Sequence, residues 1–155
     1  MKNEIPEYVS HTDCEIRGFF GEKCRFLSNF YKTSVWFEGL LYPSSEAAYQ
    51  AAKVDEDSRK EFLVCTATES KKLWKKLPPM FTAEQWDLVK YDTMSEIVFE
   101  KFVRNLGLRK KLIETGNRYL EETNHWSDVY WGVDYKTGIG ENQLGKLLMK
   151  VRENS

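Results

Sequence analysis

FLSNFY (residues 26–31) and LYPSSEAAYQAAK (residues 41–53) decide the fold of this chain. The first stretch predicts a strand of aromatic and amide side chains. A short hairpin joins it to the second stretch, which is nearly all strong helix formers after its proline. This helix carries Glu46 in its first turn and Lys53 two turns later. Because aromatic residues crowd both stretches, we expect an aromatic pocket with an acid and an amine at its edge.

The pattern along the whole chain predicts an α+β fold, a single mainly helical domain with a small antiparallel sheet. Strands are expected within residues 16–42, with the hairpin tip at Glu38-Gly39, and again at 119–121. Ser44 or Ser45 caps the helix at 45–53. Apolar spacing, caps and breakers predict the remaining helices, at residues 58–65, 69–77, 82–105, 108–114 and 142–152. The expected domain covers residues 1–155, of which 1–15 form an N-terminal extension.

Composition limits the classes of partner. The 155 residues are 41% hydrophobic and 30% charged, as expected of one soluble globular domain. A net charge of -1 argues against the broad basic surface of a protein that grips nucleic acid through its phosphates. KKLWKK (71–76) and RKK (109–111) are interpreted as solvated helix faces, although either is able to form a small local basic patch.

Cysteine and histidine usage gives no sign of metal or thiol chemistry. Cys14, Cys24 and Cys65 share no metal-binding or redox spacing, and His11 and His125 lie in no recognisable local signature. We therefore predict no metal site and no cofactor. The first residues lack the apolar core of a signal peptide, and no apolar run reaches the roughly 18 residues of a membrane helix. A cytoplasmic protein that does not enter the membrane is expected.

Three stretches carry candidate chemistry, each with a structural alternative. Glu46, Tyr49 or Gln50, and Lys53 share one helix face, but a glutamate in a first turn and a lysine at a helix end are also ordinary stabilisers. In NHWSDVYWG (124–132), a carboxylate between two indoles is suited to hold or donate a proton, or it makes a local turn bond to its own backbone. In GIGENQLGKLLM (138–149), glycines ahead of a helix favour an anion, yet the spacing matches neither phosphate-binding fingerprint.

Together these stretches resemble the NADAR family, the YbiA-like N-glycosidases. The resemblance covers the chain from about Gly18 and comprises GFFGE (18–22), FLSNFY (26–31), YPSSEAAYQAAK (42–53), KFVRN (101–105), ETGNRYLEE (114–122), DVYWG (128–132) and GENQLGKLLMKVR (140–152). Ser70 and Trp74 depart from the small residues that relatives tend to have, and Val133 follows Gly132 in place of a second glycine. These departures bear on the substrate more than on the reaction.

The resemblance implies hydrolysis of the N-glycosidic bond at ribose C1. Its two substrate classes are ADP-ribose attached to guanine, in nucleosides or DNA, and the phosphoribosylamino-pyrimidine made early in riboflavin synthesis. The expected stand-alone chain and the basic cluster around Trp74 favour the first. A sensor that binds ADP-ribose or NAD without hydrolysis is the third reading, and no obligate protein partner is implied.

The motifs and the resemblance together predict the site residues. Catalytic roles are expected at Glu46, Lys53 and Asp128. Substrate contacts are expected at Asn29, Phe30, Tyr49, Trp126, Trp131, Gly132, Gly140, Asn142 and Gly145. Breaking the bond leaves an electron-deficient sugar carbon, so Glu46 and Asp128 would stabilise that carbon and supply a proton, in either order. Alternatively, a neutral Lys53 attacks C1 after the sugar ring has opened and forms a Schiff base, which requires a lysine pKa lowered by burial or a neighbouring cation.

Overall fold

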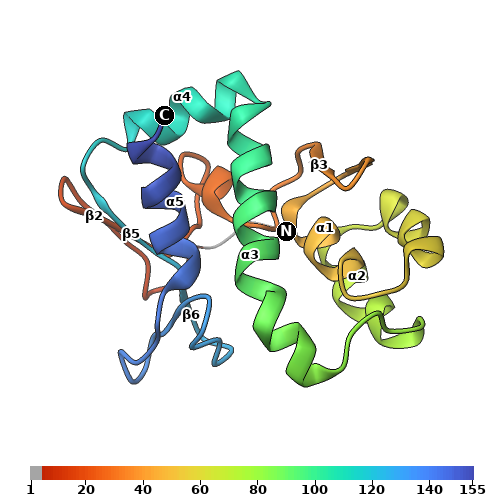
Figure 1. Cartoon of the computed structure of the whole chain (residues 1–155). Coiled ribbons are helices and arrows are strands. Elements are labelled where there is room, and N and C mark those ends of the chain that lie inside the picture. The colour runs from red at the N-terminus through yellow and green to blue at the C-terminus, as the bar shows by residue number, and fades with distance from the viewer. Residues whose placement is uncertain (1–4) are drawn as a thin grey trace. The chain divides into compact units, whose positions relative to one another are not determined.

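The computed structural model describes residues 5–155 and confirms the α+β class (Figure 1). Its backbone packs as two compact units, which we call the central unit (residues 29–106) and the terminal unit (the residues up to 28 and from 107 on). The prediction of one domain over 1–155 stays a prediction, and residues 1–4 of its N-terminal extension lie outside the described part of the chain. Within the described residues, no helix has the length and apolar character needed to cross a bilayer.

The central unit is mainly helical. Its elements are β3 (Val35–Phe37), β4 (Leu40–Tyr42), α1 (Ser45–Ala51), the 3-10 helix η2 (Glu56–Val64), α2 (Ala67–Leu73), the 3-10 turn η3 (Trp74–Lys76) and α3 (Ala83–Val103). Figure 1 shows α1 and α2 side by side, and the two helices pack against each other. Two of the predicted helices differ in form from the prediction. The helix expected at 58–65 is the 3-10 helix η2, and the helix expected at 69–77 is α2, which tightens into η3 at its end.

The hairpin tip is at Glu38-Gly39, as predicted. β3 and β4 pair antiparallel with Val35 opposite Tyr42, and both tip residues have positive φ, 46° and 85°. Turns of this kind match the twist of the two strands. Positive φ is unfavourable for a glutamate, but the carboxylate of Glu38 accepts a hydrogen bond from the buried guanidinium of Arg59. That ion pair holds the tip against η2.

The cap of α1 is Ser44, one of the two predicted serines. Its hydroxyl accepts a hydrogen bond from the backbone N–H of Ala47 at 3.0 Å. The sequence predicts a buried alanine face opposite Glu46 and Lys53, yet every residue of α1 is buried. A helix of seven residues is too short to be stable alone, so its surroundings maintain it.

α3 begins with the predicted capping box between Thr82 and Gln85. Its core residues are Met94, Ile97, Val98 and Phe102, all buried. The apolar spacing of this helix predicts a core stripe that also includes Trp86 and Val89. That prediction is wrong for these two residues, which are half-buried, because the first turns of the helix extend beyond the core. Lys101 is only 1% exposed, and burial lowers the pKa of its amine to about 7.

The prediction of a strand over FLSNFY is wrong. Arg25–Leu27 form the 3-10 turn η1, and residues 28–34 form turns and irregular chain. The N–H groups of Leu27 and Ser28 donate to carbonyls three residues back, at 3.1 and 3.0 Å, rather than to a neighbouring strand. The amide and aromatic side chains are consequently presented by turns.

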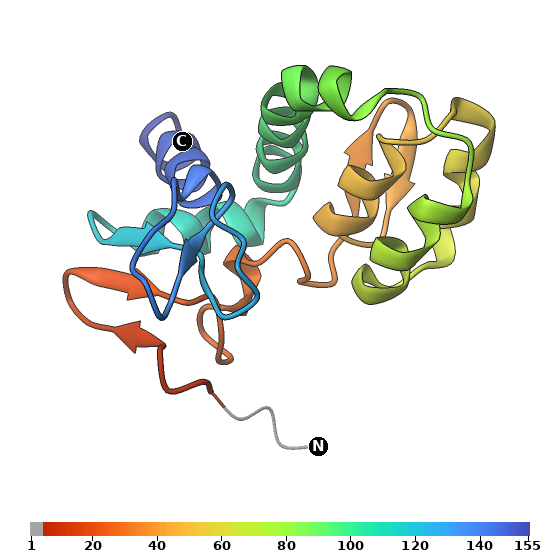
Figure 2. The same ribbon diagram turned by 90° about the horizontal axis from the view of Figure 1, so that it is seen from below.

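The terminal unit contains the other elements. They are β1 (Ser10–His11), β2 (Glu15–Arg17), η1, α4 (Leu106–Glu114, starting at the boundary), β5 (Tyr119–Glu121), β6 (Thr123–Asn124), β7 (Val133–Asp134) and α5 (Gln143–Glu153). β1 pairs antiparallel with β2, but the pairs β2–β5 and β6–β7 are parallel, which the antiparallel prediction did not include. α5, dark blue in Figure 2, packs on β5 and buries Leu144, Leu147 and Leu148.

Candidate active site

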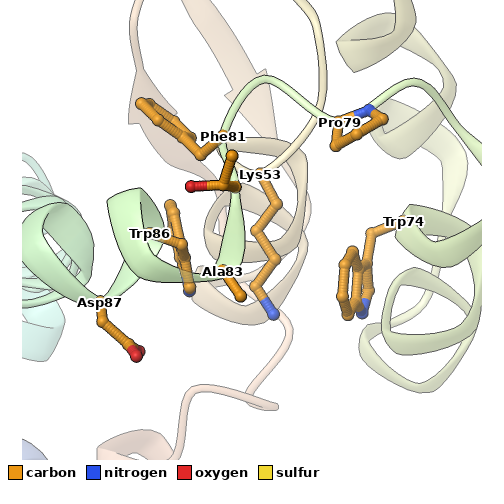
Figure 3. A pocket seen from close by; sticks show the side chains of 8 residues that line it. Lys53, Trp74, Pro79, Phe81, Ala83, Trp86 and Asp87 are labelled. Atoms are coloured by element: carbon orange, nitrogen blue, oxygen red, sulfur yellow. The ribbon is translucent and has the colours of Figure 1, made fainter.

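A pocket in the central unit is built around the amine of Lys53 (Figure 3). It has a volume of about 220 Å³, and its lining includes Lys53, Trp74, Pro79, Phe81, Trp86 and Asp87. Ligand pockets for drug-sized molecules have roughly 300–1,000 Å³, so this one suits a single flat ring and the atoms next to it. The lysine comes from the turn after α1, and the two tryptophans come from η3 and α3.

Aromatic rings enclose the Lys53 amine on several sides. Nζ lies 4.2 Å from the ring centroid of Trp74, 5.2 Å from that of Tyr49 and 5.6 Å from that of Trp86. Figure 3 shows the lysine side chain between the two indoles. Tyr49 and Trp86 also contact each other, with ring centroids 5.2 Å apart. Water therefore reaches the amine from few directions.

This enclosure lowers the pKa of Lys53 from 10.5 to about 8, chiefly through burial. The charge of Glu46 acts in the opposite direction and raises the pKa, whereas the nearby Lys71, Lys75 and Lys90 lower it further. With a pKa near 8, roughly a tenth of the amine is neutral at pH 7. A neutral amine is a nucleophile, so the condition for Schiff-base chemistry is met here.

Glu46 is buried at the start of α1, 8% exposed, and its orientation is fixed. The side-chain amide of Gln50 donates to its carboxylate at 2.6 Å. The backbone N–H of Glu46 donates to the carbonyl of Asn29 at 3.0 Å. The structure thus brings Lys53 and Tyr49 into contact and places Glu46 within electrostatic range of the amine, while the roles of these residues stay predictions.

Asn29 and Phe30 do not line the Lys53 pocket, although the backbone of Asn29 is bonded to that of Glu46. The amide of Asn29 is buried and donates to the sulfur of Met94 at 3.5 Å, which supports a packing role. Phe30 is 45% exposed and lines a different cavity, beside the start of α1. The prediction that both contact substrate remains untested.

Of the residues that line the pocket, sequence reasoning predicted only Lys53, and the large or charged side chains that it missed are Trp74, Phe81, Trp86 and Asp87. Trp74 stands between four lysines in KKLWKK, which was interpreted as a solvated face, although a large ring in so polar a segment is a signal of a packed or bound partner. Trp86 was assigned to the core because its spacing continues the stripe of α3. Helical period alone does not separate a core ring from a ring at a pocket.

Asp128 lies in the terminal unit and makes local turn bonds to the backbone of its own loop, which is the alternative to a proton role that the sequence left open. Its Oδ1 accepts from the N–H groups of Tyr130 and Trp131, at 3.2 and 3.0 Å. The amide of Asn124 bridges the same turn by bonding the N–H and the carbonyl of Asp128. The carboxylate therefore shapes the loop, and its catalytic role stays a prediction.

The two tryptophans of this loop differ in their surroundings. Trp126 is 49% exposed and packs edge-on against the ring of His125, with centroids 4.9 Å apart. Trp131 packs against Tyr130 at 4.7 Å. His125 in turn shares a hydrogen bond of 3.1 Å with the hydroxyl of Tyr8. The exposed face of Trp126 is available to a flat ligand.

Asn142 ties the start of α5 to the end of β5. Its side-chain oxygen accepts from the N–H of Glu122 at 3.0 Å, and its amide donates to the carbonyl of Leu120 at 2.9 Å. It makes no side-chain cap bond. The side chain thus holds two segments of the terminal unit together, and its predicted contact to substrate stays a prediction.

The glycine-rich approach to α5 uses its N–H groups internally. Those of Asn142, Gln143 and Leu144 donate to carbonyls of the loop at residues 130–132. These three N–H groups are therefore not free to bind an anion, while the predicted contact of Gly140 to substrate stays a prediction.

Gly132 and Gly145 are required by close packing of the backbone. A Cβ atom on either glycine would lie 2.1 Å from a carbonyl oxygen, that of Glu122 or that of Leu120. Their predicted contacts to substrate are not needed to explain them.

The comparisons with known proteins place this chain in a family. The NADAR domain model matches residues 18–154, so the chain belongs to the NADAR family. It is 33% identical over 129 residues to the N-glycosidase YbiA of Escherichia coli (strain K12), covering 81% of this chain and 78% of that protein. It is 38% identical over 130 residues to a riboflavin biosynthesis protein of Vibrio vulnificus (strain YJ016), covering 83% of this chain and 35% of that protein.

A solved structure agrees with this assignment. The NMR structure of Escherichia coli YbiA matches with a TM-score of 0.75 at 29% identity, over 96% of this chain and 88% of that one. The chain spans about a third of the length of the Vibrio protein. The predicted family is confirmed, and at the level of the family so is the predicted enzyme class, the hydrolases of N-glycosyl bonds.

Proposed function

We propose that this protein is an N-glycosidase that removes ADP-ribose from guanine, with Lys53 as its nucleophile. The observation that carries the proposal is the Lys53 amine, enclosed by rings and poised with a pKa of about 8 at a pocket sized for one flat ring. Binding alone does not call for a partly neutral lysine. The names of the relatives support an N-glycosyl bond as the target.

The proposed reaction starts with the neutral Nζ of Lys53, which attacks C1 of the ribose. The bond from C1 to the base nitrogen breaks, and its electrons leave with that nitrogen, which takes up a proton. The lysine nitrogen loses a proton, and the sugar ring opens as its oxygen is protonated, which gives a Schiff base at C1. Water then adds to C1, the lysine nitrogen departs, and the free sugar is released.

Glu46 is the group proposed to carry protons in these steps. Its carboxylate is buried in the first turn of α1, the helix that precedes Lys53, and its charge acts on the amine. The indoles of Trp74 and Trp86 would stack on the departing base and exclude water from the first step. Asp128 is retained as the second proposed acid, to be tested separately from its role in the turn.

The test is an oligonucleotide that carries ADP-ribosyl-guanine, with the products followed by mass spectrometry. Free ADP-ribose and restored guanine are expected from the natural protein, and no turnover from Lys53→Met. Borohydride added during turnover should reduce the Schiff base and fix the sugar on the peptide that contains Lys53. Lys72→Met, an exposed lysine on α2, is the matched control and should keep full activity. An untouched oligonucleotide would refute the proposed substrate.

A second candidate substrate is the phosphoribosylamino-pyrimidine of riboflavin synthesis. The specific observation in its favour is the 38% identity to a protein named for riboflavin biosynthesis. Turnover of this compound, but not of the modified oligonucleotide, would select it. If the protein bound ADP-ribose and left both substrates intact, the sensor reading would replace the enzyme.

A further inference from the structure

A second cavity of the central unit, which we call the Phe30 cavity, lies beside the start of α1. Its volume is about 440 Å³, against about 220 Å³ for the Lys53 pocket. Its wall includes the half-exposed ring of Phe30, the amine-bearing Lys32, the cap residue Ser44 and the end of η2 at Val64. An aromatic ring and a lysine in a cavity of this size suit a nucleoside.

One lysine is close to both cavities. The Nζ of Lys71 lies 5.6 Å from the ring centroid of Phe30. The same charge acts on the Lys53 amine and lowers its pKa. Lys71 is exposed on α2, which packs beside α1. A ligand that entered both cavities would therefore have this ammonium group near its middle, where a negative charge would be stabilised.

The two cavities are at opposite ends of α1. Ser44 caps its first turn and Lys53 follows its last, so at 1.5 Å per residue they are separated by roughly 13 Å along the axis. An extended diphosphate with a ribose at each end covers such a distance. A single ribose 5-phosphate does not.

We infer that the Phe30 cavity binds the adenosine end of an ADP-ribosyl substrate, with the Phe30 ring on the adenine and Lys71 on the diphosphate. This inference rests on the proposed function and deepens it, because it selects a nucleoside diphosphate attached to ribose over a simple phosphoribosyl compound. The reacting ribose then reaches the Lys53 pocket, and the Phe30 cavity sets the preference for ADP-ribosyl over phosphoribosyl substrates.

The first test is binding, measured by calorimetry with two probes, ADP-ribose and ribose 5-phosphate. The natural protein should bind ADP-ribose at least about five-fold more tightly, since stacking one base contributes about 1–3 kcal/mol. Phe30→Ala, Lys71→Gln and Val64→Trp, which fills the cavity from an exposed position, should each lose most of that preference. Lys72→Gln removes a neighbouring charge on α2 and should keep it.

The second test is cleavage, with a substrate shortened at one end only. Treating the ADP-ribosylated oligonucleotide with a nucleotide pyrophosphatase removes the adenosine monophosphate and leaves phosphoribosyl-guanine with the same scissile bond. The natural protein should favour the intact substrate in kcat/KM by about five-fold or more. Phe30→Ala should lower kcat/KM for the intact substrate and leave it unchanged for the shortened one.

The outcomes separate this inference from the proposed function. Equal binding of the two probes by the natural protein, or a preference that survives in Phe30→Ala and in Val64→Trp, overturns the adenosine site whatever the cleavage result. Cleavage of neither oligonucleotide overturns the proposed function, while the binding experiment still decides the site. Equal cleavage of both substrates overturns the inference and leaves the N-glycosidase in place.

Discussion

Replacing Glu46 by glutamine should lower the pKa of Lys53 and leave its enclosure by rings unchanged. Gln50 would still find an oxygen acceptor at position 46, so the cost to the fold should be small. Glu46 and Lys53 are seven residues apart, or roughly 10 Å along a helix axis. With an effective dielectric constant of about 20, a charge at that distance contributes about 1.7 kcal/mol, or about 1.2 pH units.

The expected result of Glu46→Gln is therefore a pKa near 7 in place of about 8. The measurement is an NMR titration of carbon-13-labelled lysine, with the signal of Lys53 assigned by its loss in Lys53→Arg. It does not depend on turnover, so a simultaneous loss of activity would not obscure it. Lys75→Met should act in the opposite direction, because it removes a charge that lowers the pKa.

Glu84→Gln is the control, an exposed carboxylate in the first turn of α3 that is not among the charges acting on Lys53. The pKa of Lys53 measured in Glu84→Gln should equal the pKa of Lys53 in the natural protein. An unchanged or raised midpoint in Glu46→Gln would show that the carboxylate does not act on the amine. The assignment of Glu46 to this site would then be wrong.

Three further predictions concern stability and the loop carboxylate. Lys101→Met should stabilise the fold at pH 6 by at most roughly 5 kcal/mol, because the buried amine is charged at that pH and its charge destabilises the folded state. This destabilisation is relieved only as the pH rises from about 7 to 10.5, so urea unfolding should show a much smaller gain in stability at pH 10 than at pH 6. An equal gain at the two pH values would contradict the prediction. Gly145→Ala should lower the free energy of unfolding by at least about 2 kcal/mol, measured by thermal unfolding, because the added Cβ would lie 2.1 Å from a carbonyl oxygen. The control Gly138→Ala adds a Cβ with nothing within 4 Å, so it should lower the free energy of unfolding only through its positive φ, by about 1 kcal/mol. Asp128→Asn keeps a side-chain oxygen that accepts the turn bonds, so the free energy of unfolding should change by less than about 1 kcal/mol. A large loss of kcat at unchanged stability would support the proposed proton role of Asp128, and full activity would refute that role.

Local signals in the sequence predicted the hairpin tip, the serine cap and the capping box. Each of these features depends on residues within four positions of one another, such as Ser44 with Ala47 and Thr82 with Gln85. The physical cause is therefore contained in a short segment that can be read directly. The same reasoning located Glu46 in the first turn of a helix, but it placed Lys53 on that helix as well, and the helix ends at Ala51, so that Lys53 lies in the turn that follows.

Features that depend on tertiary packing were not predictable in the same way. The parallel pairing of β2 with β5 joins segments about a hundred residues apart, as Ile16 with Leu120. The rings of Trp74 and Trp86 meet the Lys53 amine from two other segments. The lysines around Trp74 indicate that its ring has a partner, but neither they nor the helical spacing of Trp86 identify that partner as Lys53. FLSNFY has the composition of a strand, but its backbone bonds within its own turns.

The burial of α1 on every side has a consequence for redesign of the pocket. Its alanines have no exposed surface at which a larger side chain would fit, so substitutions along α1 would disrupt packing before they changed selectivity. The rings of Trp74 in η3, Phe81 just before α3 and Trp86 in the first turns of α3 are only half-buried and able to change size. Libraries that seek a new base preference should therefore vary Trp74, Phe81 and Trp86 and leave α1 as it is.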